Sequence, residues 1–191
     1  MRRLLNYIML LTITALFNIG CTQSFIVGDT LASDTHYEIG DIISIRGVKG
    51  IVFQTTPSVK IVSVTEGYTT WGESGVTTGV TDQNNGKLNM AAIQSISGWE
   101  TKYPAFKWCA DIGDGWYLPA LNELKEIYKQ KDVLNRVLSA NHMSELGLND
   151  GWLWSSTEES GYLAYLVLIS GGSDFSGYKN NSDAVRAVLA F

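Results

Sequence analysis

Short runs of β-branched residues alternate with turn residues over the part of the chain that follows residue 36. Gly47 and the sequence Thr56-Pro57-Ser58 separate these runs. β-branched residues are typical of strands, whereas Gly, Pro and Ser are typical of the turns between strands. The pattern predicts a long loop over 68–85, preceded by three strands of a meander at Ile39–Ile45, Gly50–Gln54 and Lys60–Thr65.

The apolar residues change to a helical spacing between residues 88 and 141. They recur there every three or four positions, which is typical of the buried face of an amphipathic helix. Pro104 and Pro119 stand where a helix can begin, because proline fits the first helical turn. Three helices are predicted, with inward-facing residues Leu88, Ala92, Ile96 and Trp99 in the first, Phe106, Cys109 and Ala110 in the second, and Leu121, Leu124, Ile127 and Tyr128 in the third.

Strand-like runs return after Gly151, at Trp152–Ser156, Tyr162–Ile169 and Ala184–Phe191. Tyr162–Ile169 is apolar at both alternating sets of positions, so we expect it in the middle of a sheet that is covered on both sides. Strands, then helices, then strands again indicate an α+β fold with one mixed sheet.

The first 20 residues have the features of an export signal. Two arginines precede Leu4–Phe17, an apolar run of 14 residues, which is short for a membrane span of roughly 20 residues. The junction Gly20-Cys21 resembles that of bacterial lipoprotein signals, although Asn18 stands where they usually have Leu. The resemblance implies that residues 1–20 are a signal peptide and that acylated Cys21 anchors the protein in the cell envelope. We expect the outer membrane, with the protein facing the periplasm or the surface. The alternative is an ordinary cleaved signal with Cys21 as a bystander.

The remaining chain divides into a tether at residues 21–36, which have little periodicity, and one domain at residues 37–191. Removing residues 1–20 takes away two arginines and no acidic residue, so the net charge changes from −5 to −7. An acidic chain without a basic run is a poor candidate for nucleic-acid binding. Cys109 would then be the one cysteine besides Cys21, and we expect it to be a small core residue.

Several known ligand-binding motifs occur in the sequence only in part. A dinucleotide loop fails at Leu118, a phosphate loop fails after Lys87, and a calcium loop that begins at Asp82 lacks its final glutamate. The two histidines are far apart and have no Cys or His at ligand spacing. We therefore expect no catalytic residue, no metal and no cofactor, and we interpret the three acids that could be imagined as a catalytic group as ordinary exposed residues: Asp150, Glu158 and Glu159.

Three segments of the second half follow a family pattern. Gly115–Leu124 matches "G-W-x-L-P-…-E-L", Trp154–Glu158 matches "W-S-S-T-E", and Val185–Val188 matches "V-R-x-V". Together they resemble a bacterial C-type-lectin-like family named after the C-terminal domain of a collagen-like adhesin. The resemblance extends over residues 37–191. It implies an α+β fold with a mixed, mostly antiparallel sheet and two to three central helices, in which the first and last strands pair and a long loop region carries ligand contacts.

The matched residues, taken by themselves, are mainly fold determinants. Glu123 suits the positive N-terminal end of a helix. Arg186 is expected to pair with a buried acid, for which Glu158 is one candidate, or to cap main-chain carbonyls. Calcium-dependent sugar-binding relatives use Pro-centred motifs that do not occur in this sequence, so binding is expected to be calcium-independent. The related formylglycine-generating enzymes use active-site cysteines, a pair that Cys109 alone cannot reproduce.

The candidate ligand-binding loop is Ser170–Asp183. Apart from Lys179, it consists of Gly, Ser, Asn and Asp around two aromatic residues, a mixture that antibody-like paratopes use. Its ligand-binding residues are predicted to be Asp174, Phe175, Tyr178, Asn180 and Asn181. The surface is expected to extend to Trp71, Asn149, Asp150, Glu158 and Tyr162. The alternative is a plain solvated hairpin, because the same small residues also make turns.

The protein is thus expected to be an envelope lipoprotein whose domain binds a protein or glycan ligand at the cell surface. The alternative is a structural subunit of the envelope or of a pilus that contacts only its own assembly, and an enzyme is the least supported class. A long exposed strand edge would favour assembly, whereas a concave surface of aromatic and polar loops would favour ligand binding.

Overall fold

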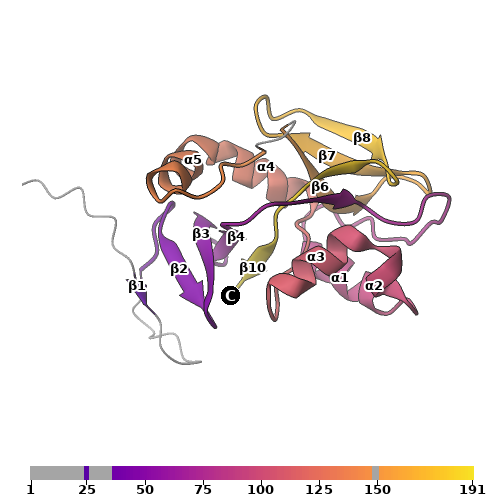
Figure 1. Cartoon of the computed structure of the whole chain (residues 1–191), viewed down its shortest axis with the longest axis horizontal. Coiled ribbons are helices and arrows are strands. Elements are labelled where there is room, and N and C mark those ends of the chain that lie inside the picture. Colours follow the sequence, from indigo (N-terminus) through magenta and orange to yellow (C-terminus); the bar gives the residue numbers. More distant parts are fainter. Residues whose placement is uncertain (1–23, 26–35, 148–150) are drawn as a thin grey trace, which may run out of the picture.

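The computed structural model describes residues 24–25, 36–147 and 151–191, which form two five-stranded sheets and five helices (Figure 1). The expected lipidation site Cys21 lies outside the described residues, as do the signal peptide and the candidate ligand residues Asn149 and Asp150. The helices are α1 (Gly86–Gln94), α2 (Trp99–Lys102), α3 (Pro104–Ile112), α4 (Leu121–Lys129) and α5 (Lys131–Ala140).

The first sheet has the strand order β1-β2-β3-β4-β10, and the second has the order β5-β9-β6-β7-β8. Strands of the first sheet are β1 (Ser24–Phe25), β2 (Ile42–Ile45), β3 (Val48–Gln54), β4 (Lys60–Ser63) and β10 (Val188–Ala190). Strands of the second sheet are β5 (Gly67–Thr70), β6 (Trp152–Glu158), β7 (Leu163–Leu168), β8 (Asp174–Tyr178) and β9 (Ser182–Val185). β1 falls within the predicted tether and pairs in parallel with β2.

A tight turn joins β2 to β3. Ile45 pairs with Val48, so Arg46 and Gly47 form a two-residue connection with φ angles of 51° and 83°. Two successive positive φ angles match the twist of the flanking strands, and glycine at the second position adopts that conformation without a steric penalty. The predicted meander over β2, β3 and β4 is confirmed.

The α+β class is confirmed, but the single sheet is wrong, because the last predicted strand is divided between two sheets. β9 pairs with β5 and β6, whereas β10 pairs antiparallel with β4. Between them the chain crosses over at Ala187, whose carbonyl accepts a hydrogen bond from the Ser63 N–H at 2.8 Å. The expected pairing of first and last strands is also wrong. The first predicted strand, β2, lies between β1 and β3, whereas the last strand, β10, pairs with β4.

The buried face of the first predicted helix is wrong. Leu88, predicted to point inward, is 58% exposed, and the buried side of α1 instead carries Asn89, Met90 and Ile93. The Asn85 side chain accepts the Leu88 N–H and caps the beginning of the helix. The buried positions of α3 and α4 are confirmed at Phe106, Cys109, Leu121, Leu124 and Ile127.

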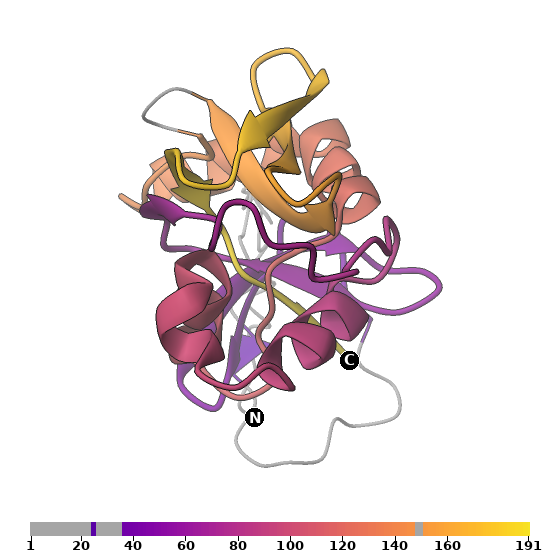
Figure 2. The ribbon, with the colours of Figure 1, turned by 90° about the vertical axis from the view of Figure 1, so that its right-hand side faces the viewer.

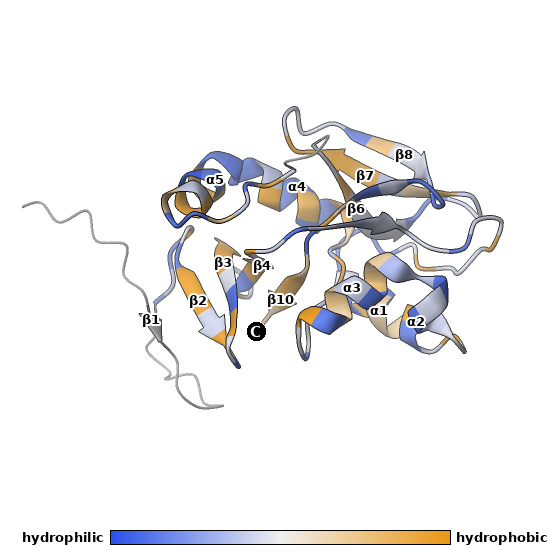
Figure 3. Ribbon diagram, viewed as in Figure 1, coloured by the Kyte–Doolittle hydropathy of each residue, from blue (hydrophilic) through white to orange (hydrophobic). Residues whose placement is uncertain are grey.

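The helices lie in two groups. α1, α2 and α3 gather on one side of the molecule, where α3 contacts β5 and β9 (Figures 1 and 2). α4 and α5 lie on the other side, and α4 contacts strands of both sheets. Figure 3 shows hydrophobic positions along β2 and β7, whereas α4 and α5 mix hydrophobic and polar positions. Within the described residues, no helix is both long and apolar enough to cross a membrane.

Candidate functional site

The segment predicted as a binding loop contains a strand. Five of its residues form β8, which pairs antiparallel with β7 and places Phe175 opposite Leu166 and Tyr178 opposite Leu163. β7 is therefore an interior strand, as predicted, and β8 is the edge of the second sheet. The free side of β7 explains the difference, because it binds even a Gly/Ser-rich segment through main-chain hydrogen bonds.

Three aromatic side chains are exposed on and beside this edge strand. Tyr162 is 61% exposed, Phe175 63% and Tyr178 59%. The Phe175 ring lies 6.0 Å from the ring of Trp152, centroid to centroid, at a tilt of 53°. Because Tyr162 O accepts the Lys179 N–H at 2.9 Å, Tyr162 sits directly beside the end of β8. The structure thus brings these predicted ligand residues to one edge of the sheet, where Phe175 and Tyr178 project from opposite faces of β8.

The polar residues predicted for the same site are also at this edge. Asp174 forms an ion pair with Lys125 of α4 at 3.0 Å. Asn180 and Asn181 are exposed in the turn between β8 and β9, where the Asn181 N–H donates to Tyr178 O at 2.9 Å. We define the β8 surface as the exposed side chains at this edge: Tyr162, Asp174, Phe175, Tyr178, Asn180 and Asn181.

Two predicted ligand residues, Trp71 and Glu158, are core residues, and their assignment to the surface is wrong. Trp71 has no exposed area and packs edge-to-face against Tyr103 and Phe106 at 5.9 and 5.0 Å. Its indole N–H donates to Ser155 O at 2.8 Å. Glu158 ends β6 and is 3% exposed, so neither side chain is available to a ligand.

Glu158 belongs to a buried charge pair that sequence reasoning missed. Its carboxylate accepts a hydrogen bond from the fully buried Lys179 ammonium at 2.5 Å. The same ammonium donates to Val76 O at 2.9 Å and lies 4.6 Å from the centroid of the Trp71 ring. Lys179 stands among Gly, Ser and Asn residues, a composition typical of solvated turns, so the local sequence carries no signal for its burial.

The Glu158 carboxylate also holds the main chain of residues 78 and 79, which lies beside the end of β6. It accepts the main-chain N–H groups of Thr78 and Gly79 at 2.9 and 2.8 Å. Burial alone would raise the pKa of Glu158, but hydrogen bonds from Lys179 and from these two amides outweigh it and lower the pKa. Glu158 is therefore an ionised anchor for residues 76–79.

We expect the protein to lose stability in acid as Glu158 is protonated. Its ordinary pKa is 4.5 and the folded-state pKa is lower. The stabilisation is therefore fully present above pH 4.5 and disappears as the pH falls through the folded-state value. Thermal unfolding of the wild type and of Glu158→Gln, which does not titrate here, measures this. The difference in melting temperature should shrink between about pH 5 and pH 2. A constant difference across that range would refute the assignment.

A second polar cluster is centred on Glu123, which is 3% exposed. Its carboxylate accepts hydrogen bonds from Lys60 Nζ at 2.7 Å and from the Tyr117 hydroxyl at 2.8 Å. It also accepts the N–H of Ala120 at 2.9 Å, which confirms the predicted role of Glu123 at the beginning of a helix, and that of Gly86 at 3.0 Å. Burial and the Glu123 charge raise the pKa of Tyr117, which keeps its hydroxyl protonated as a donor.

Arg186 joins the two sheets. Its guanidinium is fully buried and pairs with Glu66 at 2.9 Å, so Glu158 as its partner is wrong. It also donates to the carbonyls of Ser63 at 2.9 Å and of Ser144 and Glu145 at 2.7 Å each. Burial lowers the pKa of Arg186, and Glu66 opposes that shift. These contacts make Arg186 a fold determinant, as predicted.

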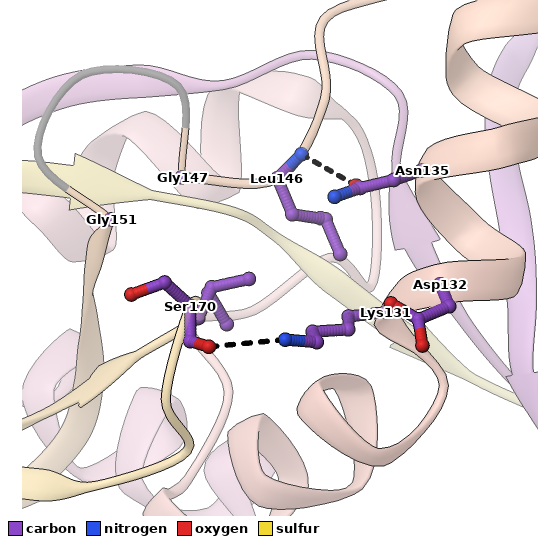
Figure 4. Close-up of a pocket in the computed structure, with 8 residues that line it drawn as sticks. Lys131, Asp132, Asn135, Leu146, Gly147, Gly151 and Ser170 are labelled. Atoms are coloured by element: carbon purple, nitrogen blue, oxygen red, sulfur yellow. Dashed lines mark hydrogen bonds between the residues drawn. The ribbon is translucent and has the colours of Figure 1, made fainter.

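A shallow cleft opens between α5 and the ends of β6 and β7 (Figure 4). Its volume is about 190 Å³, below the roughly 300–1,000 Å³ of typical ligand pockets. Two of its polar contacts are internal to the protein, since Leu146 N–H donates to Asn135 at 2.9 Å and Lys131 Nζ donates to Ser170 O at 3.1 Å. The cleft is therefore a weaker candidate than the β8 surface.

The described part of the chain contains no group of three or more His, Cys, Asp or Glu that could hold a metal ion. Cys109 is fully buried, and burial raises the pKa of its thiol well above the usual value. A protonated, inaccessible thiol is a poor nucleophile, so Cys109 is the core residue that the sequence predicted.

No protein-family model and no curated protein sequence matches the chain. Among solved structures, the fold is similar to that of a fimbrial protein from Bacteroides ovatus ATCC 8483, with a TM-score of 0.55 and 18% sequence identity over 70% of this chain. The chain covers 36% of that fimbrial protein. At this identity the likeness concerns the fold alone.

Proposed function

We propose that the chain is a binding module of the bacterial cell envelope that holds a macromolecular partner through the β8 surface. The observation that carries the proposal is the group of exposed aromatic side chains at the edge of a rigid sheet: Tyr162, Phe175 and Tyr178. Tyrosine and phenylalanine are enriched in protein interfaces because they supply large contact areas at a small cost in conformational entropy.

The rest of the proposal follows from the sequence. The lipoprotein-like junction at Cys21 supports a lipid anchor in the outer membrane, facing the periplasm or the surface. The segments around Trp116, Trp154 and Arg186 support a C-type-lectin-like domain. The missing Pro-centred motifs support binding without calcium, and a binding protein needs neither a cofactor nor a catalytic residue.

A structural subunit of a fimbria or of the envelope is the second candidate function. Two observations favour it: the similar solved structure is described as a fimbrial protein, and β8 is an edge strand with exposed aromatic residues. A free strand edge can pair with another chain through main-chain hydrogen bonds. The two candidate functions therefore share one surface and differ in its occupant.

The double variant Phe175→Ala with Tyr178→Ala tests the β8 surface. Both side chains are mostly exposed, so the melting temperature should change little, whereas capture of partners from envelope extract should fall at least tenfold, the loss typical of interface hot spots. Glycan arrays run with the same proteins separate glycan from protein partners. Tyr68→Ala is the matched control, because Tyr68 is 53% exposed on β5 at the opposite edge of the same sheet. Undiminished capture by the folded double variant would place the site elsewhere.

A further inference from the structure

β8 directs every second main-chain amide away from the sheet. Leu168 N–H donates to Ser173 O and Lys179 N–H donates to Tyr162 O, both at 2.9 Å. These bonds set the phase of the antiparallel ladder, in which hydrogen-bonded and non-hydrogen-bonded pairs alternate. Residues 173, 175, 177 and 179 therefore bond to β7. The N–H and C=O groups of Asp174, Ser176 and Tyr178 point outward.

Within the described ranges, β2, β10 and β5 each have a bond or a neighbouring strand on the side that faces away from β3, β4 or β9. β10 bonds to Tyr117 through both main-chain groups of Val188, each at 2.9 Å, and β2 pairs with β1. On β5, Thr69 O accepts the indole N–H of Trp154 at 3.2 Å. On the outward side of β8, a turn bond from Asn181 N–H to Tyr178 O is found, and that carbonyl has a second lone pair. β8 is thus a five-residue edge whose outward amides are available to another strand.

We propose that β8 pairs antiparallel with β8 of a second copy of this chain, so that the two sheets become one continuous ten-stranded sheet. The inference rests on the proposed function, since it names the occupant of the β8 surface. The two-fold axis passes between the Ser176 residues of the two copies, and Asp174 of each copy lies opposite Tyr178 of the other. All the outward-pointing amides then meet outward-pointing carbonyls.

The sequence of β8, Asp-Phe-Ser-Gly-Tyr, is complementary to itself in this register. Phe175 of one copy lies across from Gly177 of the other, so the largest side chain meets the residue without one. Leu166 and Trp154 crowd the position above Gly177, which gives the incoming ring apolar groups to contact. On the other face the Tyr178 hydroxyl can donate to the Asp174 carboxylate. A two-fold interface requires such self-complementarity.

The charges of the edge permit this pairing. No residue of β8 lies opposite a like charge, and Asp174 already has a counterion in Lys125 at 3.0 Å. A single charged residue on an edge strand normally discourages strand addition. The ion pair with Lys125 partly neutralises Asp174, so this charge discourages strand addition less than a free carboxylate would. A second copy is therefore a better occupant than a strongly charged peptide.

The pairing should be weak between free molecules, because a five-residue edge buries less than the 1,200–2,000 Å² of standard interfaces. Chains anchored in one membrane meet at a much higher effective concentration, as linked binding modules do. We therefore expect the dimer to form where the full chain is displayed, and the test uses the full chain in bacterial cells.

Ser176→Cys in the full chain tests the register directly. Directly opposed residues of a hydrogen-bonded antiparallel pair have Cα atoms about 5.5 Å apart, within the range of about 4.4–6.8 Å that a disulfide spans. Under mild oxidation, most of the variant should migrate as a disulfide-linked dimer on a non-reducing gel. Cys109 is buried and does not compete. The matched control is Thr70→Cys on β5, at the opposite edge of the same sheet, which should remain monomeric.

A second variant separates pairing from random collision. Asp174→Pro added to Ser176→Cys removes an outward N–H at the first position of β8 without removing a bond to β7, and it should lower the dimer yield at least fivefold. Equal cross-linking of Ser176→Cys and Thr70→Cys, or none, would overturn the proposed pairing. If cross-linking fails while Phe175→Ala with Tyr178→Ala still abolishes capture, the β8 surface binds another protein and the proposed function stands. If both fail, both proposals are wrong.

Discussion

Replacing Lys179 with methionine is expected to lower the free energy of unfolding by about 3–5 kcal/mol, the cost typical of breaking a buried ion pair from one side. The variant leaves the Glu158 carboxylate without its cation at a site that is almost fully buried. It also removes the donor to Val76 O and the cation over the Trp71 ring. Denaturant unfolding followed by tryptophan fluorescence measures the loss, which is a large part of a typical stability of about 5–15 kcal/mol.

Two comparisons make this result specific. Lys107→Met breaks a pair with Asp111 on the surface of α3 and should cost less than about 1 kcal/mol. Adding Glu158→Gln to Lys179→Met removes the stranded charge but keeps an acceptor for the Thr78 and Gly79 amides. The double variant should therefore be more stable than the sum of the single losses predicts. A Lys179→Met protein as stable as Lys107→Met would show that the pair contributes nothing.

Arg186→Met should be comparably destabilising, at about 3–5 kcal/mol, because one side chain serves four acceptors. Its loss leaves the Glu66 carboxylate and the carbonyls of Ser63, Ser144 and Glu145 without these bonds. It also removes the link at which the chain passes from β9 to β10. Circular dichroism and chemical denaturation measure the effect on both sheets.

Arg46→Met is the matched control. Arg46 lies in the exposed turn between β2 and β3 and pairs with Asp114 on the surface. That change should alter stability by less than about 1 kcal/mol. Arg186→Lys keeps the charge but loses the planar fork of donors. Its free energy of unfolding should therefore lie between those of the wild type and of Arg186→Met. If Arg46→Met and Arg186→Met have the same free energy of unfolding, the buried Arg186 guanidinium does not stabilise the contact between the two sheets.

The sequence predicted those elements whose signal is local. Pro104 and the spacing of Phe106 and Cys109 locate α3, and β-branched runs with turn residues locate β2, β3 and β4. Both kinds of signal depend on neighbours in sequence, through helical periodicity or turn geometry. They fail where the partner is distant. Nothing near Arg186 shows that the chain changes sheets there.

The site residues divide in the same way. Phe175 and Tyr178 were predicted correctly as exposed, because a Gly/Ser-rich segment gives an aromatic ring little to pack against. Trp71 and Glu158 were predicted wrongly, since their burial depends on Lys179 and on α3. A lysine in a polar run is nearly always solvated, so the sequence favoured the wrong environment for Lys179.

The buried charge pairs also determine when the domain can become stable during synthesis. Lys179 bonds to a carbonyl 103 positions earlier, and Arg186 to one 123 positions earlier. Until residues 179–190 have been synthesised and have left the ribosome, Glu158 and Glu66 lack their cations, and the first sheet lacks β10. The chain should therefore remain in a loosely folded, protease-sensitive form during most of its synthesis. It should then fold in a single late step, as expected for a domain whose decisive contacts are far apart in sequence.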